Sequence, residues 1–401
     1  MDFKISINTL LPFLTLFQGW LFAILLVLRG WREERYSDLW LAFILFLQGL
    51  IVIPFLLGWL GINFLWEELT FLPWDGFGWA VVPAMYLFLK SLINDEWRFV
   101  WRRDGVHFIP YLVVFCYHLI IGGYGLYNRD FVLNWWHKIE NQYFIDGSFL
   151  ILSYVQTFFY YYLGWQLYKA YQLWTATQFS DLDKVNYSWF RNFLILNVIV
   201  TSASLLNTIY LQFVSFGYDR MWLSYGATMI LTYYLSISGF AQSRVRGVHF
   251  IPQKEETIIE NTILTTGNTE GGTFIENDES VVAIPIKNGL TDEELTAWKS
   301  KLLQLIETQK PYLQPDLTLS DLANLLKTNT SVISQVVNTG FNKNFNDFIN
   351  SYRVDEYLQK VATPQYKHLT LLAIAFECGF NSKTTFNRAF KKMTGKAPST
   401  F

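Results

Sequence analysis

The first 246 residues alternate between long apolar runs and short polar segments. Each run is close to the ~20 residues that an α-helix needs to cross about 30 Å of hydrocarbon. The runs lie at 5–28, 39–60, 74–93, 107–124, 147–168, 190–214 and 221–242. The pattern therefore predicts an all-α domain over residues 1–246, built as a bundle of seven transmembrane helices.

Basic residues between these runs predict the orientation of the bundle. Twelve Lys and Arg residues lie in the segments after runs one, three, five and seven or at the run ends that border them, where Lys90 and Arg191 stand, whereas four lie on the opposite side. In membrane proteins the cytoplasmic loops carry the excess of positive charge. We therefore expect a multi-pass membrane protein with its N-terminus outside and its C-terminal region in the cytoplasm.

Polar side chains within runs five and six recur at helical spacing. They are Gln156 and Tyr160 in run five, and Asn197, Thr201, Ser204 and Thr208 in run six. Because polar groups that face lipid are costly, these side chains are expected to face protein or water. They either line a pocket for a small amphipathic ligand or form hydrogen bonds between helices, and the pattern is compatible with both.

The apolar periodicity is lost after residue 246. Residues 247–289 hold seven acidic and two basic residues, the composition of a flexible acidic linker. A connecting helix is predicted within residues 290–310, with an apolar stripe formed by Leu295, Trp298, Leu302 and Leu305. This stripe either packs on the domain that follows or forms a seam with a second copy, as in a homodimer.

Residues 311–401 show one plan twice: a short helix, a turn, and a second helix with a polar outer face. Capping side chains stand before the predicted helices: Thr318, Asn329, Asn344, Thr370 and Ser382. The helix after Asn344 reaches about residue 361 and connects the two units. Gly379 is placed to end a helix in the second unit. The spacing predicts a double helix-turn-helix domain.

In each of the two predicted helix-turn-helix units, the outer face of the second helix carries side chains of the kinds that read DNA in other proteins. In the first unit they are Thr330, Ser331, Ser334, Gln335 and Asn338; in the second they are Lys383, Thr384, Asn387 and Arg388, with Lys391 and Lys392 toward the end. Amides and guanidinium groups read base edges, and ammonium groups hold phosphates. We expect Lys391 and Lys392 to contact phosphate and all the other side chains of the two sets to contact bases.

Several motifs in this region carry a resemblance to a known family. They are LSDLANLL with SVISQVV, FINSYRVDEYL, and IAFECGFNSKTTFNRAFKKMTGKAPS. Residues 311–401 resemble the DNA-binding domain of the AraC family of bacterial transcription regulators. The resemblance implies binding to double-stranded promoter DNA, and it implies that the membrane is the bacterial cytoplasmic (inner) membrane. Lys327 departs from the family, which usually has a small or turn-prone residue at that turn. More loosely, PAMYLFLKSL and HFIPYL resemble seven-span membrane domains that are fused to AraC-type tails.

Composition separates the two halves and gives little support to catalysis. The chain is 52% hydrophobic and 16% charged, and its net charge of −2 averages an apolar membrane part with a basic tail. The chain holds two Cys, and its five His are scattered, so the sequence indicates neither a metal site nor a cofactor. It also lacks a nucleophile elbow and a phosphate-binding glycine loop, so we do not expect an enzyme.

Two functions from different classes remain. The first is a membrane-bound transcription regulator, in which the seven-helix domain senses an unknown small-molecule or protein signal and the tail binds promoter DNA. The alternative is a transporter or membrane enzyme that carries a regulatory helix-turn-helix tail. Inverted repeats with intramembrane charges are typical of transporters, and an odd number of runs does not fit that plan.

Overall fold

The computed structural model describes residues 7–59, 76–128, 139–183, 185–211, 218–242, 250 and 290–400. The chain divides into two compact units. The first comprises Met1–Tyr168 with Ser188–Ile251, and the second comprises Lys169–Tyr187 with Pro252–Phe401. The predicted linker 247–289 lies outside the described residues, except for Phe250.

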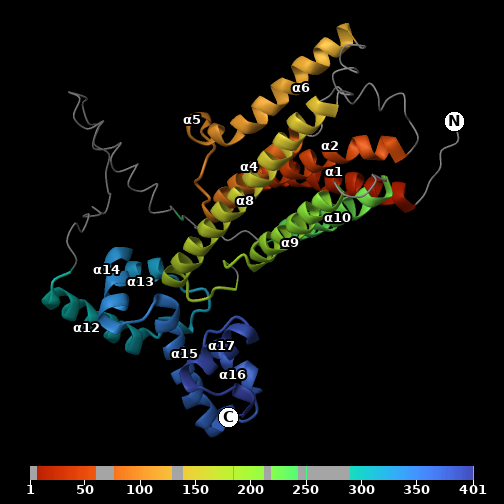
Figure 1. Ribbon diagram of the computed structural model, residues 1–401. Helices are drawn as coiled ribbons and strands as arrows, with labels where there is room; N and C mark the ends of the chain where they lie inside the picture. The colour runs from red at the N-terminus through yellow and green to blue at the C-terminus, as the bar shows by residue number, and fades with distance from the viewer. Residues whose placement is uncertain are drawn as a thin grey trace, which may run out of the picture. The chain divides into compact units, whose positions relative to one another are not determined.

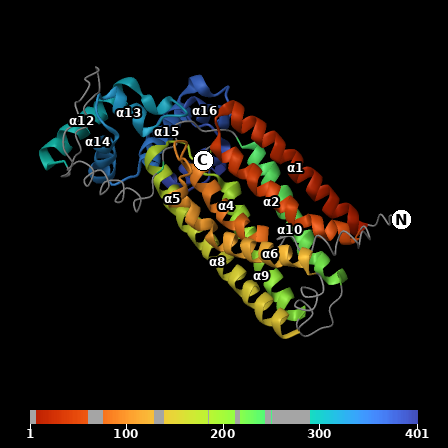
Figure 2. The same ribbon diagram turned by 90° about the horizontal axis from the view of Figure 1, so that it is seen from above.

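Each of the seven predicted runs coincides with one helix of the first unit. The helices are α1 (Ile7–Glu33), α2 (Tyr36–Trp59), α4 (Gly76–Ile93), α6 (Ile109–Tyr127), α8 (Ile139–Gln178, whose last turns belong to the second unit), α9 (Ser188–Leu211) and α10 (Tyr218–Ala241). Helix α1 packs along α2 and α10, α2 packs on α4, and α10 packs on α9 (Figure 1 and Figure 2). A short helical segment precedes α6, formed by α5 (Trp101–Asp104) and η1 (Gly105–Phe108).

Three described helical stretches are long and apolar enough to cross a membrane: Pro12–Glu33, Tyr36–Ile53 and Ser188–Tyr210. The apolar stretch Phe77–Ile93 is shorter. These stretches support a multi-pass membrane protein, and the number seven stays a prediction. Large apolar side chains point outward from them, for example Ile24 at 59% exposure and Leu206 at 68%. Such an apolar surface fits contact with lipid better than contact with water.

The second unit is also helical over its described residues. From residue 290 onward its helices are α12 (Asp292–Gln309), η2 (Pro311–Leu313), α13 (Leu319–Leu325), α14 (Thr330–Gln335) with the π-helical turn η3 (Val336–Gly340), α15 (Phe345–Ala362), η4 (Pro364–Tyr366), α16 (Leu371–Glu377), α17 (Lys383–Thr394) and η5 (Pro398–Thr400). One isolated antiparallel bridge, between Phe179 and Thr318, joins the segment after α8 to the residue before α13.

Two apolar clusters hold this unit together, and α15 contributes to both. The first gathers α12, α13 and α14 around Phe345, Phe348 and Ile349 of α15. The second gathers α16 and α17 around Val354 and Tyr357 of the same helix. A single continuous helix therefore connects the two predicted helix-turn-helix units.

The stripe on α12 packs within its own unit. Leu302 and Leu305 are buried in the first cluster, and Leu295 and Trp298 pack against it. A Thr291–Glu294 capping box starts α12, and Lys310 ends it in the left-handed conformation. Of the two readings of the stripe, packing on the following domain is the one found in this structure.

Candidate nucleic-acid interface

Helix α17 is fixed in place by its caps and by one apolar face. Ser382 Oγ accepts a hydrogen bond from the Thr385 backbone N–H at 3.1 Å, which satisfies one of the free donors at the helix start. Phe386 and Phe390 are buried, with their ring centroids 4.7 and 5.6 Å from that of Tyr357 on α15. Gly395 ends the helix with a φ of +75°. The sequence-based prediction of this helix and its cap is confirmed.

The opposite face of α17 is open and carries positive charge. Lys383, Thr384, Arg388, Lys391 and Lys392 are exposed and Asn387 is half-buried, and the helix contains no carboxylate. Lys392 Nζ contacts Asp347 of α15 at 2.6 Å. Because exposed ion pairs contribute little stability, a DNA phosphate can replace Asp347 as the partner of Lys392 at small cost. The arrangement suits insertion into a major groove.

Helix α14 and the π-helical turn η3 that follows it present a smaller polar face. Ser331 and Asn338 are exposed, whereas Thr330, Ser334 and Gln335 are half-buried. Asn338 Nδ2 donates to Ser334 Oγ at 3.3 Å. Gln335 Oε1 accepts the backbone N–H of Leu290 at 3.1 Å, a contact that the sequence pattern did not indicate. Gln335 thus attaches the segment before α12 to the first helix-turn-helix, and its role in reading bases stays a prediction.

Arg353 is the buried centre of this domain, with 0% of its surface exposed. Its guanidinium donates to the backbone oxygens of Tyr312 and Gln314, each at 2.7 Å, and to that of Pro315 at 3.3 Å. Burial lowers the pKa of Arg353 to about 10, and the nearby carboxylates of Asp181 and Asp316 oppose this lowering. The guanidinium therefore stays charged at neutral pH and ties α15 to the segment that leads into α13.

In both helix-turn-helix motifs, the turn between the two helices contains a residue with positive φ. Gly379 has a φ of +91°, and a Cβ at this position would lie 2.5 Å from the backbone oxygen of Tyr312. Only glycine fits there, as its predicted role in ending a helix requires. Lys327 occupies the corresponding turn of the first helix-turn-helix, with a φ of +53°. Lys327 therefore fits this turn by adopting the left-handed conformation itself, although the AraC pattern has a small or turn-prone residue there.

The predicted pocket residues of the first unit take part in contacts between helices. Tyr161 of α8 contacts Thr201 of α9, with 3.0 Å between their hydroxyl oxygens. Gln156 Nε2 donates to the Trp79 backbone oxygen on α4 at 3.1 Å. The Tyr160 hydroxyl lies 2.8 Å from His107 Nδ1. These contacts favour the reading of the stripe as interhelical hydrogen bonds, and the ligand pocket stays a prediction.

The rest of the stripe bonds within α9 or to α8. Asn197 Nδ2 donates to the Phe193 backbone oxygen at 2.8 Å, and Thr208 Oγ1 donates to that of Ser204 at 2.9 Å. Gln156 Oε1 is buried without a hydrogen-bond partner in the described part of the chain. Among those residues, no three His, Cys, Asp or Glu side chains gather in a way that could hold a metal ion.

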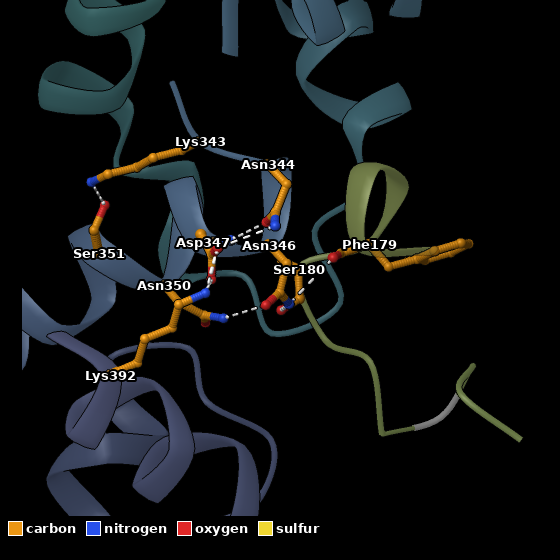
Figure 3. Close-up of polar contacts among 9 residues, drawn as sticks. All are labelled: Phe179, Ser180, Lys343, Asn344, Asn346, Asp347, Asn350, Ser351 and Lys392. Atoms are coloured by element: carbon orange, nitrogen blue, oxygen red, sulfur yellow. Dashed lines mark hydrogen bonds and ion pairs between the residues drawn. The ribbon is translucent and has the colours of Figure 1, made fainter. Parts of the chain in front are cut away.

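One group of residues near α17 was not indicated by the sequence pattern. The segment Phe179–Asp183, which follows α8, lies against α13, α15 and the start of α17 within the second unit. Figure 3 shows its contact with α15, where Asn346 points to the backbone oxygens of Phe179 and Ser180. These contacts join residues more than 130 positions apart in the chain, so no local motif could predict them.

Comparison with known proteins identifies the type of the C-terminal domain. A family model described as a helix-turn-helix domain matches residues 322–401. This supports a DNA-binding domain of the AraC type at the C-terminal end, as the motifs predicted. No curated protein and no solved structure matches the chain.

Proposed function

We propose that this chain is a membrane-bound, sequence-specific DNA-binding transcription regulator. Residues 1–246 form a seven-span domain that detects a signal, and the C-terminal domain binds promoter DNA on the cytoplasmic side. The observation that carries the proposal is the open basic face of α17 on a domain that matches a helix-turn-helix family. The apolar helices of the first unit support attachment to the membrane.

Two helices are proposed to read DNA, one from each helix-turn-helix of the domain. Helix-turn-helix recognition helices enter the major groove, and sites on one face of the duplex are about one turn, ~34 Å, apart. Because α15 packs against both helix pairs, it sets the separation of α14 from α17. The proposed base contacts are Thr330, Ser331, Ser334 and Gln335 on α14 with Asn338 on the following turn η3, and Lys383, Thr384, Asn387 and Arg388 on α17.

Chromatin immunoprecipitation of the full-length protein tests this function. We expect enrichment of a small set of promoter regions that share a motif with two halves about one helical turn apart. A matched variant, Arg388→Ala, should lose enrichment at these regions while it remains in the membrane fraction at the same level. Enrichment that follows DNA accessibility alone, equal for both proteins, would refute sequence-specific binding.

The orientation requires a separate test because it decides whether the tail can meet DNA. The positive-inside pattern supports a cytoplasmic C-terminus. Fusion of a cytoplasm-active reporter to the C-terminus should give signal, and fusion of a reporter that is active only outside the membrane should not. The opposite result would rule out the proposed function.

A further inference from the structure

The segment after α8 is bound in a prepared site on the helix-turn-helix domain. Ser180 is fully buried. Its Oγ donates to the Leu317 backbone oxygen at 2.6 Å, and its backbone N–H donates to the same oxygen at 3.2 Å. Arg353 Nη2 in turn donates to Ser180 Oγ at 3.2 Å. The segment therefore reaches the buried centre of the domain.

Helix α15 adds a second set of contacts to this segment. Asn346, which is 8% exposed, donates from Nδ2 to the Ser180 backbone oxygen at 2.7 Å (Figure 3). Asn350 holds Asn346 in position by donating to its Oδ1 at 3.2 Å. The bridge between Phe179 and Thr318 completes the attachment. Since buried polar groups are costly unless they are paired, this set of side chains is arranged for the segment.

The same segment places two carboxylates at the N-terminal end of α17. The Asp183 carboxylate accepts hydrogen bonds from the hydroxyls of Ser382 and, at 2.7 Å, of Thr385. Asp181 Oδ2 accepts from Asn381 Nδ2 at 2.9 Å. The twelve-residue α17 adds the positive end of its dipole at this point. Each donor comes from the two residues before α17 or from its first turn.

A DNA phosphate, like these carboxylates, is an anion that accepts hydrogen bonds from hydroxyl, amide and helix N-terminal N–H donors. Phosphates bind at helix N-termini and to Ser, Thr and Asn side chains, and helix-turn-helix proteins contact DNA with the N-terminal residues of the recognition helix. Negative charge from Asp181 and Asp183 at this position repels the duplex and occupies the donors that would hold it.

We propose that Phe179–Asp183 is an internal ligand of the helix-turn-helix domain, which takes the place of a DNA phosphate at the start of α17. Docking of the segment and binding of DNA are then mutually exclusive, and the docked domain is the inactive state. The inference rests on the proposed DNA-binding function. It gives the membrane domain a direct means of control, because α8 is one helix of 40 residues that ends at Gln178, directly before the segment.

Charge-neutral variants of the full-length protein in lipid nanodiscs test the competition. Asp183→Asn and the double variant Asp181→Asn/Asp183→Asn should bind duplex DNA about five- to tenfold more tightly than the wild type, since a coupling of this kind typically lies in that range or above. The probe is a duplex enriched by immunoprecipitation or, where none is enriched, a random-sequence duplex. Asp355→Asn, which removes an exposed carboxylate from α15, is the control for net charge and should change the affinity by less than about twofold.

Equal affinity of the wild type and both carboxylate variants would overturn the competition, and so would a gain that Asp355→Asn reproduces. If neither the wild type nor any variant binds duplex, the proposed function itself fails. A result in which the wild type binds and the variants do not improve refutes the internal ligand alone.

Hydrogen exchange of the wild-type protein gives a readout that needs no variant. The Ser180 amide, which donates to Leu317, should exchange slowly without DNA and faster once DNA is bound, because linkage makes the effect reciprocal. Unchanged exchange of residues 179–183 at saturating DNA would show that the segment stays docked on the DNA-bound domain and would overturn the proposal.

Discussion

At the scale of single residues, the most consequential side chain is Arg388, because it is an exposed guanidinium in the middle of the basic face of α17. Arginine binds guanine with two parallel hydrogen bonds, whereas a lysine on phosphate acts as a point charge. The two kinds of contact therefore differ in what their loss does to sequence preference.

Arg388→Ala should weaken binding to the preferred sequence by about 1–3 kcal/mol and relax the preference at one base pair. Lys391→Ala, two turns from the helix start, should weaken binding to all sequences alike and lower the salt dependence by about one unit of slope. Titration of each variant against preferred and scrambled duplexes, at two salt concentrations, separates the effects. A uniform loss for Arg388→Ala would reassign it to a phosphate contact.

Two glycines of the second unit offer a comparison of strain with and without a steric clash. Gly379 and Gly395 both have positive φ, but a Cβ at Gly379 meets the Tyr312 backbone oxygen at 2.5 Å, whereas no atom of the described residues lies within 4 Å of one at Gly395. Gly395→Ala should cost roughly 1 kcal/mol of stability, the penalty of the left-handed conformation. Gly379→Ala should cost clearly more, since backbone atoms must move. Thermal unfolding of both variants measures the difference, and equal costs would contradict the close approach at Gly379.

At the scale of elements, α12 is part of the DNA-binding domain rather than a spacer before it. Leu302 is fully buried in the cluster formed with α13, α14 and α15. Leu302→Ala should therefore destabilise the domain by about 2–5 kcal/mol, the usual cost of removing a buried leucine side chain. Gln304→Ala, at an exposed position of the same helix, is the control and should change stability by about 0.5 kcal/mol or less. Similar unfolding of both variants would place α12 outside the core.

Local signals predicted where several helices of the second unit begin. Helix α12 (Asp292–Gln309) lies within the predicted residues 290–310, and Thr318, Asn329, Asn344, Thr370 and Ser382 each cap the helix that follows them. Capping and periodicity act between residues three or four positions apart, so they can be read from sequence.

Long-range contacts could not be predicted in the same way. The contact of Ser180 with Arg353 joins residues 173 positions apart, and the bond from Leu290 to Gln335 depends on how α12 folds back. The burial of Arg353 is a further example, since an arginine in an amphipathic helix is ordinarily exposed. The face of α17 was predictable because its apolar and polar sides separate within twelve residues.

At the scale of the whole molecule, the proposed function requires that a signal in the membrane domain alters DNA binding. Asn197 and Thr201 of α9 contact Tyr161 of α8 through hydrogen bonds. Changing both to Leu should leave insertion intact, because leucine is favoured in hydrocarbon. If they line a ligand pocket, signal-dependent transcription should be lost in the double variant, as measured with a reporter gene. Unchanged signal-dependent transcription would exclude the pocket and leave a role in helix packing.

The attachment of both recognition helices to one α15 has a consequence for the operator. Helix α14 offers hydroxyls and an amide, whereas α17 offers mainly positive charge, so the proposed function requires one chain to read two unlike half-sites in a fixed order. Palindromic sites arise from identical subunits related by a two-fold axis, and a single chain of this kind has no such axis. Under the proposed function we therefore expect an asymmetric operator with a polarity, and we expect its inversion to turn the membrane-attached regulator away from the gene.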